Sequence, residues 1–384
     1  MDFTIRDFDL RNSFSLERKL LLVLGFYPIR DKEKHRILHQ LSAFLNLLLY
    51  YGQLLTIIIQ MVIDRNDLSK LTDSTLYFLT LFTFLCKLFN FQYYGKDLIE
   101  VEKSLTDPIF YGYSFHKLQI IKAKVRSCTL VCLAFRISCT CSCFIYSVVP
   151  FIDRSGQKTL SIPGWFPYDT AKHFYITFFL QSLSLFISAH CNSATDTLPC
   201  KLISLATAQF ELLKDNLRTI DYENSFEETK HALVKCITHH RKIVNYTKRV
   251  ETIFSKGIFL QLFASVLVIC TTGFQLVIVP FGSLKFAIHG IYLCAMTAQI
   301  AIYCYYGHDV MITSDEIGTS LYMSNWYASH IKIRKIMVIF LEKTKKPTIV
   351  LAGNFITLSL VTLTQILRSA YSYFAVLRRL YADD

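Results

Sequence analysis

Three cysteines at alternate positions, Cys139, Cys141 and Cys143, have the spacing most suggestive of a metal site in this 384-residue chain. They fall within an apolar segment that predicts a helix, where alternate residues point about 200° apart and cannot share one ion. We therefore expect no metal or other cofactor there and interpret the cysteines as small buried hydrophobes.

His239 and His240 stand in a basic helical segment, where solvated side chains are expected rather than ligands. Without an intact HExxH, GxSxG or Walker lysine motif, the sequence does not favour an enzyme.

Three charged residues, Lys87, Arg136 and Arg368, lie inside apolar segments. A charge within a membrane costs at least about 2.5 to 3.5 kcal/mol, so each needs compensation. We expect Lys87 and Arg368 to reach an interface or a hydrated cavity, and Arg136, in mid-segment, to need an acceptor or water. No Asp or Glu lies deep in any of these segments. That absence disfavours a proton-relay or ion-coupled transporter.

The composition is that of a membrane protein. Hydrophobic residues make up 52% and charged residues 18% of the chain, whereas soluble domains carry about 25% charge. A soluble enzyme, a disordered chain and a disulfide scaffold are all disfavoured. The net charge of +12 is spread between the apolar segments and forms no basic stripe, so we expect no nucleic-acid partner.

Seven apolar segments are long enough to cross a hydrocarbon core of about 30 Å and predict an all-α, seven-transmembrane fold. They cover residues 37–63, 72–94, 127–152, 173–194, 257–279, 286–306 and 348–380. The short turn around Pro280, Gly282 and Ser283 predicts an antiparallel hairpin. The last segment follows Pro347 directly, which suits the first turn of a helix.

The basic residues predict the orientation, because cytoplasmic loops retain Lys and Arg. Residues 1–36 hold eight of them, and the second, fourth and sixth connections hold six, ten and six. The first, third and fifth connections hold only two, three and one. We therefore expect a cytoplasmic N terminus and an extracellular C terminus, the reverse of a G-protein-coupled receptor.

The fourth and sixth connections are amphipathic, so helices should continue below the membrane. Their apolar faces suit either a subunit contact or a helix lying on anionic lipid. The last segment carries a polar stripe that ends in apolar residues, namely Thr362, Gln365, Ser369, Tyr373, Val376 and Leu380. Such a stripe suits a helix that lines an aqueous path, and interhelical hydrogen bonding is the alternative.

The C-terminal fifth of the chain, from Tyr303 to Leu380, resembles the signature of the insect odorant receptor family. The matching motifs are Ser-Asn-Trp-Tyr at 324–327, Lys-Pro at 346–347, Ala-Gly at 352–353 and Ala-Tyr-Ser-Tyr-Phe at 370–374. Weaker support comes from Ala-Thr-Asp-Thr-Leu at 194–198 and from the seven-segment layout.

This resemblance implies a plasma-membrane, odorant-gated, non-selective cation channel of olfactory neuron dendrites. In the family, a tuning subunit and a shared coreceptor form a heterotetramer, and no G protein is required. The chain lacks the coreceptor's long insertion in the fourth connection, so it resembles a tuning subunit. The implied partners are the coreceptor, a small, mostly apolar volatile ligand, membrane lipid and permeating cations. A gustatory-type or self-sufficient homotetrameric channel is the alternative, and a G-protein-coupled receptor is less favoured.

The resemblance also assigns roles to positions of this sequence. The last helix should line the pore past Gln365, Ser369 and Tyr373, with Val376 and Leu380 as its gate. The anchor between subunits should include the range 198–217 together with Trp326, Tyr327, Ile331, Val338 and Leu341. An odorant pocket in the outer half of the bundle should include Phe78, Leu81, Phe82, Cys139, Ser142, Tyr146, Phe178, Ser182, Tyr292 and Met296. For each aromatic residue in that set, simple helix packing is the alternative.

Six parts of the chain are therefore expected. A cytoplasmic N-terminal segment (1–36) precedes helices one to four with the ligand pocket (37–194). A cytoplasmic helical connection (195–256) leads to helices five and six (257–306). A cytoplasmic anchor that includes the first part of helix seven (307–347) leads to the pore-lining part of that helix with a short extracellular tail (348–384).

Overall fold

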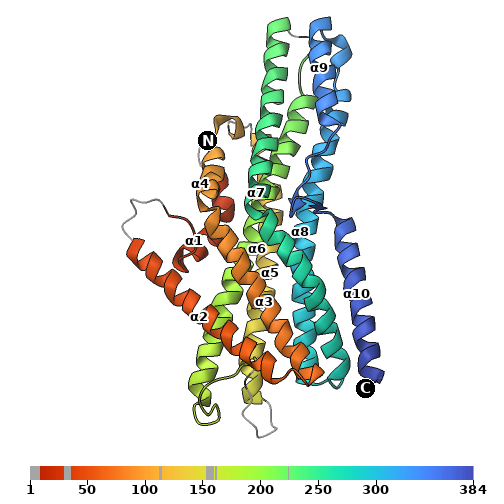
Figure 1. Cartoon of the computed structure of the whole chain (residues 1–384). Coiled ribbons are helices and arrows are strands. Elements are labelled where there is room, and N and C mark those ends of the chain that lie inside the picture. Colours follow the sequence, from red (N-terminus) through yellow and green to blue (C-terminus); the bar gives the residue numbers. More distant parts are fainter. Residues whose placement is uncertain are drawn as a thin grey trace.

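The computed structural model describes residues 9–29, 36–111, 115–152, 160, 162–223 and 225–383, and it is a bundle of long helices (Figure 1). Six of the described helices are long and apolar enough to cross a membrane, and they coincide with the first six predicted segments. These are α2 (Arg36–Ile63), α3 (Leu68–Tyr93), α5 (Phe115–Ile152), α6 (Phe174–Arg218), α7 (Phe226–Ile278) and α8 (Leu284–Tyr322).

Shorter elements complete the described chain. They are η2 (Leu10–Phe14), α1 (Ser15–Val23), α4 (Gly95–Ser104), η3 (Pro108–Phe110), η4 (Trp326–Ala328), α9 (Ile331–Thr344), β1 (Leu351–Ala352), β2 (Ile356–Thr357) and α10 (Leu360–Asp383). Helices α6, α7 and α8 continue past the bundle and form a projecting part together with α9 (Figure 1). The prediction that helices continue through the fourth connection is therefore confirmed.

Helix α6 forms the centre of the molecule. Every residue from 193 to 210 is buried, because α5, α7 and α8 all pack around this helix. Leu198, Leu205 and Leu217 are at most 1% exposed within the single chain. The expectation that the range 198–217 packs against another subunit is therefore wrong, since these side chains already fill the chain's own core.

The tight turn between α7 and α8 forms as predicted. Ser283 donates its backbone N–H to Pro280 O at 3.1 Å, and Gly282 adopts a φ of +79° that suits glycine. The Ser283 hydroxyl oxygen then accepts a hydrogen bond from the Phe286 backbone and caps α8. The two helices are antiparallel neighbours, as the short turn requires.

The last helix begins later than predicted. Residues 351–357 form an antiparallel hairpin, in which Leu351 pairs with Thr357 and Ala352 with Ile356. Gly353 and Asn354 both have positive φ, of 62° and 68°, which glycine and asparagine tolerate best. The expectation of a helix from Thr348 is therefore wrong, because this Gly-Asn turn forms a hairpin and α10 begins only at Leu360.

Helix α10 lies beside α7 and α8 as the seventh helix of the bundle (Figure 1). It is not among the six helices that are apolar enough to cross a membrane by composition alone, since its polar stripe and arginines lower its hydropathy. The first residues of α2 and the end of α10 lie at opposite ends of the bundle (Figure 1). That arrangement fits an odd number of crossings.

Candidate ligand cavity and pore helix

A cavity of about 120 Å³ lies among α2, α3, α5, α6 and α8, and its walls are mostly carbon. Four of these helices contribute residues at spacings of three and four, so each turns one continuous face towards the space. The contributing residues are Tyr77, Thr80, Leu81 and Phe84 on α3, Cys139, Ser142, Cys143 and Tyr146 on α5, Leu185, Ser188, Ala189 and Asn192 on α6, and Tyr292, Ala295 and Met296 on α8. Gln53 and Ile57 of α2 and Ile162 complete the lining.

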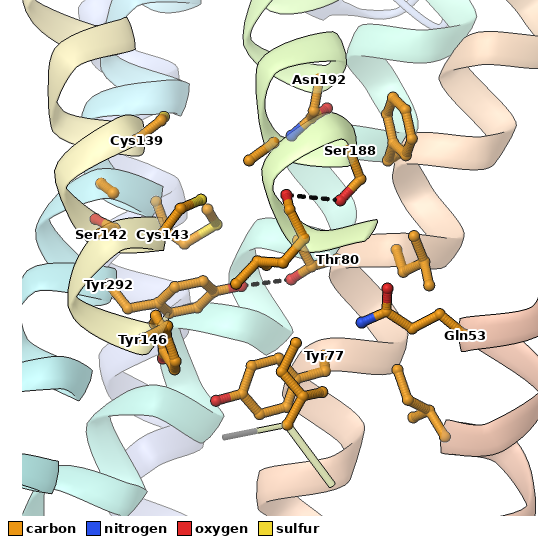
Figure 2. Close-up of a pocket in the computed structure, with 18 residues that line it drawn as sticks. Gln53, Tyr77, Thr80, Cys139, Ser142, Cys143, Tyr146, Ser188, Asn192 and Tyr292 are labelled. Carbon is orange, nitrogen blue, oxygen red and sulfur yellow. Dashed lines mark hydrogen bonds between the residues drawn. The ribbon is translucent and has the colours of Figure 1, made fainter. Parts of the chain in front are cut away.

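Hydrogen bonds within the lining fix several polar groups. The Thr80 and Tyr292 hydroxyls lie 2.5 Å apart and join α3 to α8 (Figure 2). The Ser188 hydroxyl donates to the carbonyl of Leu185 at 3.0 Å, so it is satisfied within its own helix. The Gln53 side-chain oxygen accepts a hydrogen bond from Ser184, which lies behind the cavity wall. These groups give the apolar space a fixed shape.

Asn192 lies at one end of the cavity (Figure 2). Its side-chain oxygen Oδ1 is buried and has no hydrogen-bond partner among the described residues. A buried acceptor without a donor costs about 1 to 3 kcal/mol, which a ligand hydroxyl could relieve. The cavity therefore combines an apolar wall with one unsatisfied acceptor.

Six of the ten proposed pocket residues line this cavity, namely Leu81, Cys139, Ser142, Tyr146, Tyr292 and Met296. The other four do not. Phe78 and Phe82 stack on each other at 5.6 Å between ring centroids, and Phe178 stacks on Phe174 at 5.8 Å. Ser182 also lies outside the lining. On α3 the inward face is about one residue away from Phe78 and Phe82, since Tyr77 and Leu81 line the cavity. On α6, Phe178 and Ser182 share a face with the lining residues Leu185 and Ala189 but lie before them along the helix.

Sequence reasoning missed the contributions of α2 and of α6, since none of the residues proposed from these helices lines the cavity. Gln53, Ser188 and Asn192 are polar residues within otherwise apolar segments, and that pattern is the signal that could have found them. Ile162 comes from the connection before α6 and carries no such signal. The connection residue Trp165 donates its backbone N–H to Thr56 O of α2 at 3.0 Å, which holds this connection against the bundle.

A buried charged cluster lies one helical turn beyond Asn192. Lys87 Nζ lies 2.6 Å from Asp196 Oδ1, and Tyr303 donates its hydroxyl to the same oxygen at 2.6 Å. Gln299 donates to the other carboxylate oxygen. The expectation that Lys87 reaches an interface or a hydrated cavity is therefore wrong, because Asp196 neutralises it within the core. Asp196 lies two residues after the predicted end of the fourth segment.

A second buried cluster joins the N-terminal segment to the bundle. Glu17 of α1 accepts hydrogen bonds from Arg136 Nη2 at 3.0 Å and from Lys201 Nζ at 2.8 Å. The expectation that Arg136 needs an acceptor is confirmed, and that acceptor comes from α1. The N-terminal segment is thus part of the packed core.

Cys139 and Cys143 face the cavity. Cys141, between them, is exposed, so the interpretation of the three cysteines as buried hydrophobes is wrong for Cys141, because alternate residues of a helix point to different sides.

His239 differs from the expectation of a solvated side chain. It is 3% exposed, and its Nε2 lies 2.9 Å from the side-chain oxygen of Gln209. Burial, with the neighbouring His240, Lys235 and Lys242, lowers the pKa of His239 to about 4. Packing between α6 and α7 explains the difference, because the ring lies inside this part of the molecule.

The face of α10 that carries the proposed pore residues is unpartnered in the single chain. Gln365, Ser369, Tyr373 and Val376 are all exposed, and Val376 is 56% exposed. Ile366 and Ala370, which follow Gln365 and Ser369 about 100° further around the helix, are buried in the bundle. Leu380 belongs to α10, but its side chain lies outside the described residues.

The proposed anchor residues divide into two groups. Tyr327, Ile331 and Val338 are exposed, whereas Trp326 and Leu341 are partly buried against the chain's own core. The projecting part of the molecule thus carries apolar side chains on its surface, although its own core is complete.

Comparison with known proteins gives a consistent result. A family model described as 7tm Odorant receptor matches residues 67–371. Odorant receptor Or1 of Anopheles gambiae is 24% identical over 98% of this chain and 97% of its own length. Odorant receptor 85c of Drosophila melanogaster is 22% identical over 77% of this chain and 79% of its own length.

Solved structures show the same fold. The insect olfactory receptor OR5 of Machilis hrabei, solved in complex with eugenol, superposes with a TM-score of 0.87 at 15% identity. That alignment covers 97% of this chain and 98% of the OR5 chain. Because the family model covers most of the chain and the relatives match over most of their length, this multi-pass membrane protein belongs to the insect odorant receptor family, a family of receptors rather than enzymes.

Proposed function

We propose that this chain is the tuning subunit of an odorant-gated, non-selective cation channel and that it forms a heterotetramer with a shared coreceptor. The observation that carries this proposal is the cavity lined by five helices, with its carbon walls and the unsatisfied oxygen of Asn192. Small-molecule sites have this character, in which apolar walls supply affinity and a few polar groups set orientation.

The ligand that fits best is a small, mostly apolar volatile molecule with one hydroxyl group. Its carbon skeleton would contact the aromatic and aliphatic walls, and its hydroxyl would donate to Asn192 Oδ1. OR5 was solved with eugenol, a compact phenol of this general kind. Binding opens a channel only if the ligand prefers the open state.

The exposed face of α10 supports a shared pore. This helix packs against the bundle on one side, and its exposed side needs a partner within a membrane. The exposed side carries Gln365, Ser369, Tyr373 and Val376. Four copies of α10 around one axis would supply that partner and enclose a polar path for cations. Val376, followed one turn later by Leu380, would form the apolar gate at its outer end.

The subunit contacts and the orientation belong to the same proposal. Exposed apolar residues on the projecting part, among them Tyr327, Ile331 and Val338, would pack against neighbouring subunits. The charge distribution supports a cytoplasmic N terminus and projecting anchor and an extracellular C terminus. Membership of the odorant receptor family supports the plasma membrane of the olfactory neuron dendrite. An epitope tag after Asp384 should therefore be accessible on intact cells.

The central experiment is whole-cell recording during application of an odorant panel. The chain is expressed alone, with the coreceptor, and with the coreceptor while G-protein signalling is blocked. We expect a rapid cation current only on co-expression and no effect of the block. Current from the chain alone would instead indicate a self-sufficient or gustatory-type channel, and a current abolished by the block would contradict an ionotropic receptor.

A pair of valine variants tests the gate. Val376→Ala should raise the current without odorant, because it removes apolar bulk at the proposed constriction. Val361→Ala is the matched control, since Val361 is equally an exposed valine but lies in the first turn of α10. Equal basal currents in both variants and the unmodified chain would exclude Val376 from the gate.

A further inference from the structure

A second cavity, of about 520 Å³, lies between α7 and the segment that runs from the end of α9 to β1. It is in the projecting part of the molecule, just before the hairpin that leads into α10 (Figure 1). Neither odorant binding nor the proposed pore uses it.

The charges around this cavity are strongly unbalanced. Four cations line it, Arg241 and Lys248 of α7 and Lys343 and Lys346 at the end of α9, against the single carboxylate of Glu251. Glu251 is buried and already forms an ion pair with Lys248. Arg241, Lys343 and Lys346 have no carboxylate partner among the described residues. The lining therefore keeps a net charge of +3 at pH 7.

The neighbouring Lys345 differs in this respect. It lies between Lys343 and Lys346 in sequence, does not line the cavity, and pairs with Glu342 at 2.5 Å. Among these three lysines, the two without a carboxylate partner are therefore the two that line the cavity. Like charges gathered around a concave surface focus a positive potential there and attract anions.

The remaining lining can hold a compact polar ligand. Asn245 and Thr348 offer hydrogen-bonding groups, and the rings of His240 and Phe340 lie edge to face at 5.4 Å. Burial lowers the pKa of His240, so its imidazole contributes hydrogen bonding rather than charge at neutral pH. The cavity lies beside the hairpin that precedes α10, and basic pockets on the cytoplasmic side of membrane proteins bind phosphorylated lipid headgroups.

We propose that this cavity binds a polyphosphorylated anion, the chemistry shared by the headgroup of a phosphoinositide lipid and a soluble inositol polyphosphate. Lysine ammonium groups and an arginine fork are the side chains that bind phosphate oxygens most strongly. Several phosphates on one small ring can engage cations on both α7 and α9 at once, which a single phosphate cannot. The ligand would thereby join α9 to α7 next to the hairpin before α10. This proposal goes beyond odorant gating and does not depend on it.

The test uses the full-length receptor purified in detergent, with inositol hexakisphosphate as the soluble probe and its binding measured by thermophoresis. The double variant Lys343→Gln/Lys346→Gln should bind about thirtyfold more weakly, since each basic residue contributes roughly five- to sixfold. Lys335→Gln/Lys345→Gln is the matched control, with the same change of net charge on the same helix but outside the cavity. Lys343→Arg/Lys346→Arg keeps the positive charges and should retain binding. That result would show that the weaker binding of the glutamine variant is not caused by misfolding.

A second arm identifies the source of the phosphates. The receptor is placed in nanodiscs of phosphatidylcholine with or without phosphatidylinositol bisphosphate, and its unfolding temperature is compared. Stabilisation by the lipid that is lost only in the cavity variant supports a headgroup, whereas binding of the soluble probe alone supports a free inositol polyphosphate. Equal weakening in the cavity and control variants, or no binding of either probe, would overturn the proposal.

Discussion

Gly307 of α8 lies directly against Leu358, two residues before α10 begins, so that a Cβ at Gly307 would lie 2.3 Å from the Leu358 Cβ. The same face of α8 carries Met296 at the candidate ligand cavity, and Gln299 and Tyr303, which donate hydrogen bonds to Asp196. These residues follow at spacings of three and four, so one continuous face of α8 extends from the cavity to Leu358, just before α10. A displacement of α8 at the cavity would therefore be transmitted to Leu358.

The first prediction concerns this contact. Gly307→Ala should destabilise the receptor by about 1 to 3 kcal/mol, because the added methyl group overlaps both the side chain and the backbone of Leu358. The measurement is the unfolding temperature of the purified protein. Gly290→Ala, on the same helix with no atom within 4 Å of the added group, is the control and should not be destabilising. Equal unfolding temperatures for the two variants would contradict the close contact.

The second prediction concerns the buried charges. Asp196→Asn should cost about 3 to 5 kcal/mol, since it leaves Lys87 charged and unpaired in the core. Delivery to the cell surface should fall and the unfolding temperature should decrease. Glu342→Gln, which breaks an exposed pair with Lys345, should cost at most about 1 kcal/mol.

A double variant separates charge pairing from packing. Lys87→Met combined with Asp196→Leu removes both charges and should be more stable than Asp196→Asn alone. If the double variant is the less stable of the two, the hydrogen bonds from Gln299 and Tyr303 to Asp196 matter more than the ion pair.

How much the sequence could predict depends on the type of signal. The length and hydropathy of 37–63 define α2 closely, because a membrane span must be both long and apolar. The segment 286–306 defines the start of α8 but not its end, since the helix continues to Tyr322. The rotation of each helix is less certain, as the stacked pair Phe78 and Phe82 shows, since aromatic residues pack on lipid, on helices and on ligands alike.

Long-range pairing could not be read from the sequence. Nothing local connects Glu17 with Arg136 or Lys87 with Asp196, which are more than a hundred residues apart. The hairpin at Gly353 and Asn354 did have a local signal, but the surrounding apolar run and the preceding Pro347 favoured a helix. In this chain the backbone preference of Gly353 and Asn354 determined the local structure, although the apolar pattern of 348–380 predicted a continuous helix.

The third prediction concerns ligand recognition. Asn192→Leu should raise the concentration for half-maximal response to alcohol and phenol odorants about tenfold, because the ligand hydroxyl loses its acceptor. Responses to hydrocarbon analogues of the same shape should be unchanged. The measurement is a pair of dose–response curves on co-expression with the coreceptor.

Ser188→Ala is the control for this prediction, since Ser188 lines the same cavity but its hydroxyl is already bonded to Leu185 O. It should shift the responses to both ligand classes equally and only slightly. If Asn192→Leu weakened hydrocarbon and alcohol responses alike, Asn192 would be shaping the cavity rather than binding a hydroxyl.

The fourth prediction concerns pH. The pKa of His239 is lowered to about 4 by burial in the projecting part, whereas an unfolded histidine titrates near pH 6.5. Between about pH 4 and pH 6.5, His239 binds a proton in the unfolded chain but not in the folded chain. Stability is therefore complete above about pH 6.5 and falls as the pH drops towards 4, with about 1 to 2 kcal/mol lost by pH 5.

The His239→Gln variant isolates this contribution, because glutamine does not titrate and can still form a hydrogen bond with Gln209. Unfolding temperatures measured between pH 7.5 and 5 should fall less steeply in this variant than in the unmodified receptor. His231→Gln, at an exposed histidine of the same helix, is the matched substitution control. Parallel curves for all three proteins would mean that His239 is reached by protons in the folded state, which would contradict its burial between α6 and α7.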